Sequence, residues 1–442
     1  MRLFGTDGVR GKANTELTPE LAQLMGRAAA AVLVGESRPL FVLARDTRVS
    51  GQMLSMALAS GLMSAGVDVW DAGVIPTPAL AYVTRDIGAS AGVMISASHN
   101  PAIDNGIKLF SGDGFKLPDA VEQEIEAKML NTEELPRVSG TDVGTFTEHP
   151  ELVDLYVQHL QELAAPLTGL TVAVDCANGA ASWIAPRLFV ELGAQVKIVG
   201  CKPDGRNINV GCGSTHPQSL QRLVKESCAD IGLAFDGDAD RLIACDKQGN
   251  LVDGDSMLAI CALHRKETNR AANHIVAGTI MSNFGLDALL RRESIEMVRT
   301  QVGDRYLLDE MRQRGALLGA EQSGHCIFLE HSTTGDGLLS AVMLLNVMVE
   351  RGATLAELDG QWERYPQVLI NVPVADRTKA MSSEHVKEAI NKASETILGH
   401  GRLLVRPSGT ENLVRVMAEA KCEETARRVV MIVVDALNLT SA

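Results

Sequence analysis

The sequence of 442 residues contains no long apolar run, since no unbroken apolar stretch exceeds seven residues, the length of residues 28–34. A helix that crosses a bilayer needs about 20 apolar residues, so we expect no transmembrane segment and no membrane partner. The first residues also lack the apolar segment of a secretory signal. This favours a cytoplasmic location.

Positive charge is also scarce, with 41 Lys and Arg against 55 Asp and Glu and a formal net charge of −14. Such a field repels a phosphate backbone, so we expect no nucleic-acid partner, whereas a small phosphate needs only a few focused cations.

Eight cysteines are present, but none form a C-x-x-C pair, and their spacing matches neither zinc nor redox motifs. We expect them to be reduced and structural.

The sequence does contain a strand–helix–strand pattern that occurs three times. The copies, each an apolar strand, a turn, a helix and a second strand, occupy residues 40–70, 171–199 and 274–300. After a further helix, each copy continues as a strand, a polar loop and another strand, and these loops are residues 96–105, 236–241 and 321–325. Apolar strands alternating with helices imply a parallel sheet covered on both faces. Ligands bind at the strand ends of such sheets, so we expect the three loops to converge on one cleft.

From about residue 370 the pattern changes to strand, helix, strand, strand and helix, with a fourth polar loop at residues 406–411. The predicted fold class is α/β, with three related mixed-sheet α/β domains and a smaller C-terminal α+β domain. The expected domains are residues 1–155, 156–254, 255–366 and 367–442.

The second polar loop places Asp236, Asp238 and Asp240 at alternate positions between small residues. Three carboxylates so spaced can bind one hard cation, and Mg²⁺ is the metal we expect. An EF-hand is excluded because Arg241 and Lys247 occupy the positions of its Gly and Glu. Arg241 offers a fork for a phosphate or carboxylate. A solvated acidic turn is the alternative.

The first polar loop places Ser98 between small residues, beside His99 and before an Asn-Pro turn. This arrangement suits an exposed nucleophile that accepts a phosphoryl group. No G-x-S-x-G elbow is present, so a hydrolase triad is not indicated. Taken alone, a plain polar turn is the more common reading, and Lys108 is more typical of a surface lysine than of a catalytic one.

Three further segments are candidates for phosphate or sugar binding. Residues 5–12 are rich in glycine and cations but do not have Walker spacing, so Arg10 is a candidate phosphate contact, with a flexible tail as the alternative. Residues 321–325 carry groups that can hydrogen-bond sugar hydroxyls or an amino group. Residues 406–410, with Arg415 beyond, are typical of an anion nest, with a solvated hairpin as the alternative. Together the loops favour phosphoryl transfer on a sugar phosphate.

In their order along the chain these motifs resemble the α-D-phosphohexomutase superfamily, and its glucosamine branch in particular. The motifs are FGTDGVRG (4–11), GVMISASHNP (92–101), DNGIK (104–108), DGDADR (236–241), EQSGH (321–325) and RPSGTE (406–411). The resemblance implies four domains around a central cleft. One departure is Asn412, where relatives often carry proline, and it is expected to loosen the phosphate loop without catalytic loss.

The resemblance also assigns roles to residues. It implies a phosphoserine at Ser98, with Mg²⁺ bound by the serine phosphate and by Asp236, Asp238 and Asp240. The other catalytic residues implied are Arg10, His99, Lys108 and Arg241. The substrate-binding residues implied are Glu321, Ser323, His325, Arg406, Ser408, Gly409, Thr410 and Arg415.

The implied reaction converts glucosamine 6-phosphate to glucosamine 1-phosphate through a 1,6-bisphosphate, for UDP-N-acetylglucosamine synthesis. A hexose 1,6-bisphosphate is expected as the phosphorylating activator, a small sugar phosphate as the partner and a homodimer as the assembly. The alternatives are a phosphomannomutase/phosphoglucomutase with broader hexose preference and a non-catalytic sugar-phosphate sensor.

Overall fold

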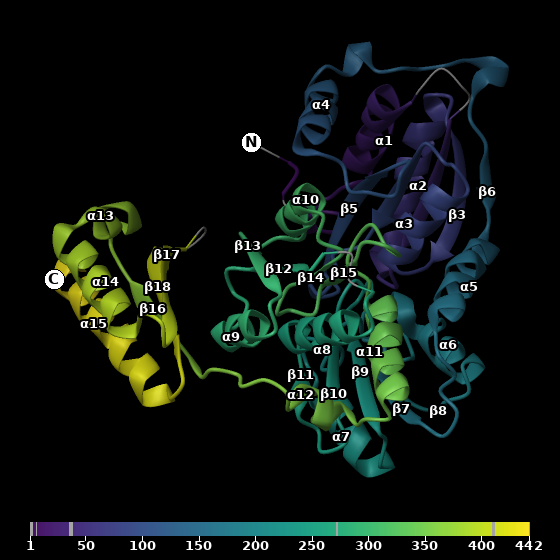
Figure 1. Cartoon of the computed structure of the whole chain (residues 1–442). Coiled ribbons are helices and arrows are strands. Elements are labelled where there is room, and N and C mark those ends of the chain that lie inside the picture. Colours follow the sequence, from purple (N-terminus) through teal and green to yellow (C-terminus); the bar gives the residue numbers. More distant parts are fainter. Residues whose placement is uncertain (1–2, 6, 35–38, 271–272, 409–411, 442) are drawn as a thin grey trace. The chain divides into compact units, whose positions relative to one another are not determined.

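The computed structural model describes the chain except residues 1–2, 6, 35–38, 271–272, 409–411 and 442 (Figure 1). Its contacts define two compact units. The first is Met1–Met281 with Ile295–Gly360, and the second is Ser282–Ser294 with Gln361–Ala442. None of the described helices combines the length and apolar character that a bilayer crossing requires.

The first unit begins with a six-stranded sheet. Its strands are Val9–Lys12 (β1), Leu40–Arg45 (β2), Asp68–Val74 (β3), Ala91–Ile95 (β4), Asp104–Ser111 (β5) and Phe146–Glu148 (β6). The helices are Pro19–Leu33 (α1), Val49–Ser64 (α2), Thr77–Asp86 (α3) and Asp119–Leu130 (α4). The strand order is β1-β5-β4-β2-β3-β6, and only β5 runs antiparallel to its neighbours β4 and β1. Helices α1, α2 and α4 pack together, whereas α3 packs against β2 and β4.

Two smaller sheets follow in the same unit. The second has strands Thr171–Asp175 (β7), Gln195–Val199 (β8), Ile231–Phe235 (β9), Leu242–Asp246 (β10) and Leu251–Val252 (β11). The third has strands Ile275–Thr279 (β12), Glu296–Thr300 (β13), Leu318–Ala320 (β14) and Cys326–Phe328 (β15). Their helices are Val153–Leu163 (α5), Ala185–Glu191 (α6), Gln218–Ser227 (α7), Gly254–Glu267 (α8), Asp304–Arg314 (α10), Gly337–Arg351 (α11) and Leu355–Asp359 (α12).

The three sheets repeat one strand order, which confirms the threefold pattern in the sequence. It is β3-β2-β4-β5 in the first sheet, β8-β7-β9-β10 in the second and β13-β12-β14-β15 in the third. In each, the first three strands are parallel and the fourth is antiparallel. The parallel arrangement implied by the alternation of strands and helices holds for three strands of each sheet, and the antiparallel fourth strand makes each sheet mixed, which confirms the predicted fold class. Each polar loop joins the antiparallel pair of its sheet.

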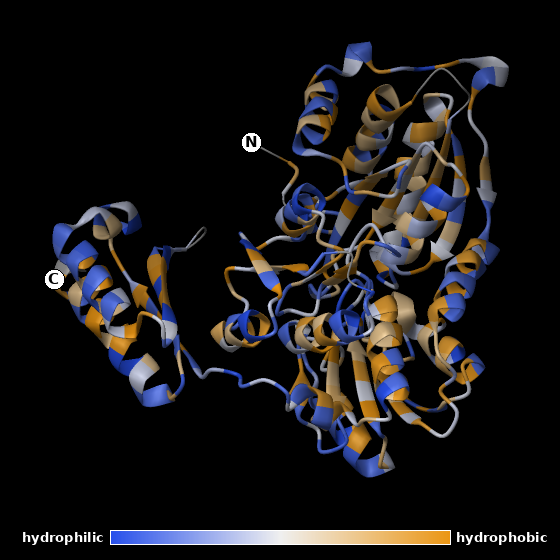
Figure 2. Ribbon diagram, viewed as in Figure 1, coloured by the Kyte–Doolittle hydropathy of each residue, from blue (hydrophilic) through white to orange (hydrophobic). Residues whose placement is uncertain are grey.

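The hydropathy of the strands explains this layering (Figure 2). Every residue of β4, β9 and β10 is buried. Strands that are apolar along their whole length need cover on both faces, which helices provide.

The eight cysteines are free thiols, five of them buried.

The second unit is a small α+β structure. Its strands Gln367–Pro373 (β16), Gly401–Pro407 (β17) and Leu413–Ala420 (β18) form an antiparallel sheet in the order β16-β18-β17. Its helices are Phe284–Arg292 (α9), Arg377–Ser382 (α13), Glu384–Ile397 (α14) and Glu423–Ser441 (α15). Helix α9 follows β12 in sequence but joins this unit, because the buried Glu419 carboxylate accepts a hydrogen bond from Phe284 N at 2.9 Å.

Candidate active site

The serine loop after β4 and the aspartate loop after β9 meet at Ser98. Ser98 is buried, so the expectation of an exposed serine is wrong, and its hydroxyl donates a hydrogen bond of 2.5 Å to Asp236 Oδ2. Ser98 has a φ of +52°, a left-handed conformation that is uncommon outside glycine. The structure thus brings together two of the loops for which we predicted convergence.

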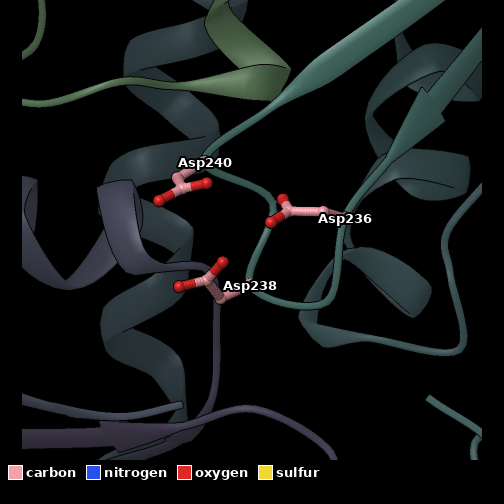
Figure 3. Close-up of side chains that lie close together, drawn as sticks. All are labelled: Asp236, Asp238 and Asp240. Carbon is pink, nitrogen blue, oxygen red and sulfur yellow. The ribbon is translucent and has the colours of Figure 1, made fainter. Parts of the chain in front are cut away.

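The aspartate loop holds Asp236, Asp238 and Asp240 around one small space (Figure 3). All three side chains are buried. One carboxylate oxygen from each aspartate can be chosen so that the three oxygens lie within 4.8 Å of one another. Burial and the charges of Asp240 and Asp238 raise the pKa of Asp236 well above its usual range. Oδ1 of Asp238 and Oδ1 of Asp240 are buried and have no hydrogen-bond partner among the described residues. Crowded carboxylates with such oxygens fit a divalent cation that takes oxygen ligands.

Lys108, on β5, lies against these aspartates. Its Nζ is 2.9 Å from Asp238 Oδ2, 3.0 Å from Asp7 Oδ2 and 3.7 Å from Asp240 Oδ2. Burial lowers the pKa of Lys108, but these carboxylates outweigh that effect and leave the pKa raised. The expectation of a surface lysine is wrong, since Lys108 is 1% exposed. It is a fixed positive charge beside the aspartate loop.

A cleft of about 420 Å³ is lined by His99, the residue that follows Ser98, whereas the buried Ser98 is not part of its lining. The predicted site residues among its lining are Arg10, His99, Asp240, Arg241, Glu321 and His325. His99 Nδ1 lies 3.3 Å from Ser98 Oγ. Burial and the charges of Arg241 and Arg10 lower the pKa of His99 to about 4, so its ring is neutral at pH 7.

The third polar loop, residues 321–325, lies against the aspartate loop. Glu321 Oε1 accepts a hydrogen bond from Gly303 N at 2.9 Å, and His325 Nδ1 lies 3.8 Å from Asp240 Oδ2. Ser323 is exposed, with its hydroxyl 3.4 Å from Glu321 Oε2. The main chain joins this loop to β10, directly after the aspartate loop, because Leu242 N donates to Gly324 O at 3.0 Å. A second bond, from Gly337 N to Ala239 O at 3.0 Å, joins the aspartate loop to the start of α11.

The fourth polar loop belongs to the second unit. Arg406 and Arg415 are opposite each other in the β17–β18 register, and Ser408 N donates to Leu413 O at 2.9 Å. Ser408 is buried, and its carbonyl accepts a hydrogen bond from Arg377 Nη1. The predicted residues Gly409 and Thr410 lie outside the described residues.

Several polar residues at the site were not predicted from the sequence. Asp7 contacts Arg10, Lys108 and Lys116, and Lys116 also binds Asp304. Thr77 Oγ1 donates to Asp238 Oδ2 at 2.6 Å. Asp7 could have been predicted from its place in the same glycine-rich run as Arg10. Thr77 could have been predicted as a polar residue between two prolines, after the second strand of the first repeat.

Four family models match the chain, and they are those of phosphoglucomutase/phosphomannomutase. Alpha/beta/alpha domain I matches residues 1–136, domain II residues 154–249, domain III residues 253–365 and the C-terminal domain residues 369–436. The chain belongs to the phosphoglucomutase/phosphomannomutase family. This confirms the fold class and the resemblance found in the motifs.

Within this family, phosphoglucosamine mutase of Geobacillus kaustophilus is 51% identical over 438 residues, covering 98% of each chain. Among solved structures, a phosphoglucomutase/phosphomannomutase family protein from Burkholderia thailandensis superposes with a TM-score of 0.84 at 25% identity, covering 99% of this chain and 97% of its own. N-acetylphosphoglucosamine mutase of Aspergillus fumigatus, solved with GlcNAc-6P and magnesium, shares the fold with a TM-score of 0.70 at 19% identity, covering 100% of this chain and 96% of its own.

Proposed function

We propose that the chain interconverts glucosamine 6-phosphate and glucosamine 1-phosphate by moving a phosphoryl group to and from Ser98. The observation that carries this proposal is the 2.5 Å hydrogen bond between Ser98 Oγ and Asp236 Oδ2. The neighbouring His99 and Asp240 line a cleft together with Arg10 and Arg241. Full-length similarity to phosphoglucosamine mutase supports the choice of sugar.

Asp236, Asp238, Asp240 and the Ser98 oxygen are the groups that would hold a divalent cation, and Mg²⁺ is the ion we propose. Their buried, mutually close oxygens suit it. Such an ion supplies charge stabilisation to the oxygens of a transferring phosphoryl group.

The chain's own cations carry out the rest of the charge stabilisation. Arg10 and Arg241 line the cleft, and Lys108 lies behind the aspartates, so three positive charges are fixed before substrate arrives. Preorganised charges of this kind favour the transition state of phosphoryl transfer. When a phosphoryl group returns to Ser98, the P–Oγ bond forms as the P–O bond to the sugar breaks. The proton leaves Ser98 Oγ, and the released sugar oxygen takes up a proton. The acceptors at hand are Asp236 Oδ2 at 2.5 Å and His99 Nδ1 at 3.3 Å.

Sugar recognition is assigned to residues 321–325. Glu321 is an acceptor for hydroxyl or ammonium groups and lines the cleft, as does His325, while Ser323 lies beside Glu321. The assignment of the non-reacting phosphate to Arg406, Ser408, Gly409, Thr410 and Arg415 rests on the motif alone.

The proposal includes a hexose 1,6-bisphosphate as activator, since an unphosphorylated Ser98 needs a phosphoryl donor before the first turnover. It also includes a cytoplasmic homodimer that acts on a small sugar phosphate, with no nucleic-acid or membrane partner.

Replacement of Ser98 tests the proposal. We expect Ser98→Ala to abolish formation of glucosamine 1-phosphate in a coupled assay started with glucose 1,6-bisphosphate, whereas Ser227→Ala, on α7, keeps wild-type turnover. Turnover by Ser98→Ala at the wild-type rate would reject Ser98 as the nucleophile. A kcat/KM for glucose or mannose phosphates equal to that for glucosamine phosphate would favour the broader hexose mutase. Binding without turnover and without phosphate on Ser98 in the intact mass would favour the sensor.

A further inference from the structure

The main chain of the serine loop is held by Arg48, a residue that the proposed reaction does not use. The Arg48 side chain is 0% exposed, and each of its five guanidinium N–H groups has an acceptor. Nε donates to Asp46 Oδ2 at 2.9 Å. The four others donate to carbonyl oxygens, namely Ser98 O at 2.9 Å, Asn100 O at 2.8 Å, Asp104 O at 3.0 Å and Pro101 O. One buried cation therefore fixes four carbonyl groups of the serine loop.

Asn209, between β8 and α7 of the domain that contains the second sheet (the second sheet domain), completes this arrangement. Asn209 is buried, and its Nδ2 donates to Ser98 O at 2.9 Å and to Asn100 O at 3.1 Å. The two carbonyl oxygens accept from both Arg48 and Asn209, so the amide must face them with its NH₂ group. Asn209 has a φ of +61°, which asparagine tolerates better than most residues.

The main-chain N–H group of Ser98 is hydrogen-bonded as well. Ser98 N donates to Ser96 Oγ at 2.9 Å, and Ser96 Oγ donates to Asp46 Oδ2 at 2.6 Å. Asp46 is the same carboxylate that binds Arg48 Nε. Both backbone polar groups of Ser98 are thus bound by one connected network, and the left-handed conformation of Ser98 is held by it.

The aspartate loop packs directly on this network. A Cβ added at Gly237 would lie 2.5 Å from Ser98 O and 3.0 Å from Asn209 Nδ2. The main chain between Asp236 and Asp238 therefore touches the Ser98 carbonyl, and the place of that carbonyl sets how Ser98 Oγ meets Asp236.

We propose that Arg48 and Asn209 are positioning residues for phosphoryl transfer at Ser98. They hold the Ser98 main chain so that the Ser98 hydroxyl is hydrogen-bonded to Asp236. Because Asn209 belongs to the second sheet domain, this placement depends on that domain as well. This inference rests on the proposed role of Ser98 and on no particular sugar.

Asn209 gives the cleaner test, because aspartate and glycine both accept its positive φ. Asn209→Gly removes the two hydrogen bonds, and Asn209→Asp replaces the donor with an acceptor that faces two carbonyl oxygens. The readouts are the rate of Ser98 phosphorylation by glucose 1,6-bisphosphate, followed by intact mass, and the steady-state kcat and KM. All are measured well below the unfolding midpoint of each variant. A loss of preorganised geometry is expected to lower the phosphorylation rate and kcat about 10- to 100-fold, with KM changed less than about 2-fold.

Asn207→Asp is the matched control. Asn207 lies in the same loop, and its Nδ2 donates to Lys202 O at 2.9 Å, away from Ser98. It should retain wild-type phosphorylation. Arg48→Lys, which offers three donors in place of five, should reproduce the loss. Arg45→Lys should not, because Arg45 Nη1 binds the Asp71 carboxylate at 2.9 Å.

Three outcomes would overturn the inference: wild-type phosphorylation rates in both Asn209 variants, an equal loss in Asn207→Asp, or a raised KM with unchanged kcat. A different sugar preference of the wild-type chain would contradict the proposed function but leave the comparison of phosphorylation rates valid. A wild-type chain that never accepts a phosphoryl group at Ser98 would overturn both.

Discussion

At the scale of single residues, the site consists of buried charges that neutralise one another at short range. Lys108 Nζ lies within 3.0 Å of both Asp7 and Asp238, and the Lys108 side chain is 2% exposed. Breaking a buried ion pair by removing one partner leaves an uncompensated charge in a medium of low polarity. The Lys108 ammonium is therefore expected to stabilise the fold.

Replacing Lys108 by glutamine is expected to lower the free energy of unfolding by about 3 kcal/mol, because Asp7 and Asp238 then repel each other without a cation between them. Urea unfolding without divalent cations measures this loss. Lys128→Gln is the control, since Lys128 forms an exposed pair with Glu134 at 3.6 Å and should cost less than about 1 kcal/mol. Equal losses in the two variants would contradict the assignment.

The sequence pointed to Ser98 and to the three aspartates because each lies in a polar loop between two apolar strands. It gave no reason to bury Lys108, since the carboxylates that surround it come from Asp7 and from the aspartate loop, each about a hundred residues away. Asn209 was missed for the same reason. Its two acceptors lie in another domain, and only the folded chain brings them within 3.1 Å.

At the scale of elements, helix α11 begins at a buried acidic cap. Asp336 accepts hydrogen bonds from Leu339 N at 2.9 Å and from Tyr156 OH at 2.7 Å. Burial raises the pKa of Asp336 to about 6, although both hydrogen bonds oppose the shift. A carboxyl group whose pKa is raised on folding stabilises the fold below its unfolded pKa and loses that contribution as pH rises through the folded value.

Asp336→Asn removes this titration but keeps the cap oxygen. Relative to the wild type, we expect the variant to gain up to about 3 kcal/mol in unfolding free energy between pH 4 and pH 7. Chemical unfolding at several pH values measures the difference. Glu357→Gln in α12 is the control with the opposite sign, because hydrogen bonds from Thr354 lower the pKa of Glu357. A difference between Asp336→Asn and the wild type that does not change with pH would refute the shift.

Several predicted elements lie where the structure has them: the copy at residues 171–199 begins with β7 and ends with β8, and the copy at residues 274–300 contains α9 and ends with β13. These follow continuous apolar strands or a capping residue such as Asn283. The helix expected between the two strands of residues 171–199 is present as α6 but is shorter, because residues 180–182 form a separate 3₁₀ helix and Pro186 fixes the start of α6. Helix α13 was missed. Asp376 caps it through bonds to Thr378 N and Lys379 N, a local signal that the longer pattern of α14 obscured.

At the scale of the whole molecule, the carboxylate cluster should link metal binding to stability. A ligand that binds only the folded chain stabilises it by about 2.7 kcal/mol at a hundred times its Kd. We therefore expect Mg²⁺ to raise the Tm of the wild-type chain and EDTA to reverse the change, at constant ionic strength. Asp240→Asn should lose this response, whereas Asp230→Asn, at a half-buried partner of Lys247, should keep it. An equal Mg²⁺ response in all three proteins would contradict the site.

The hydrogen bond from Leu242 N to Gly324 O joins residues 321–325, proposed to contact the sugar, to the strand that directly follows the aspartate loop. A swap of residues 321–325 for those of a relative with another sugar preference would therefore shift the carboxylates as well. Re-engineering the selectivity of this enzyme calls for transplanting both segments as a single cassette.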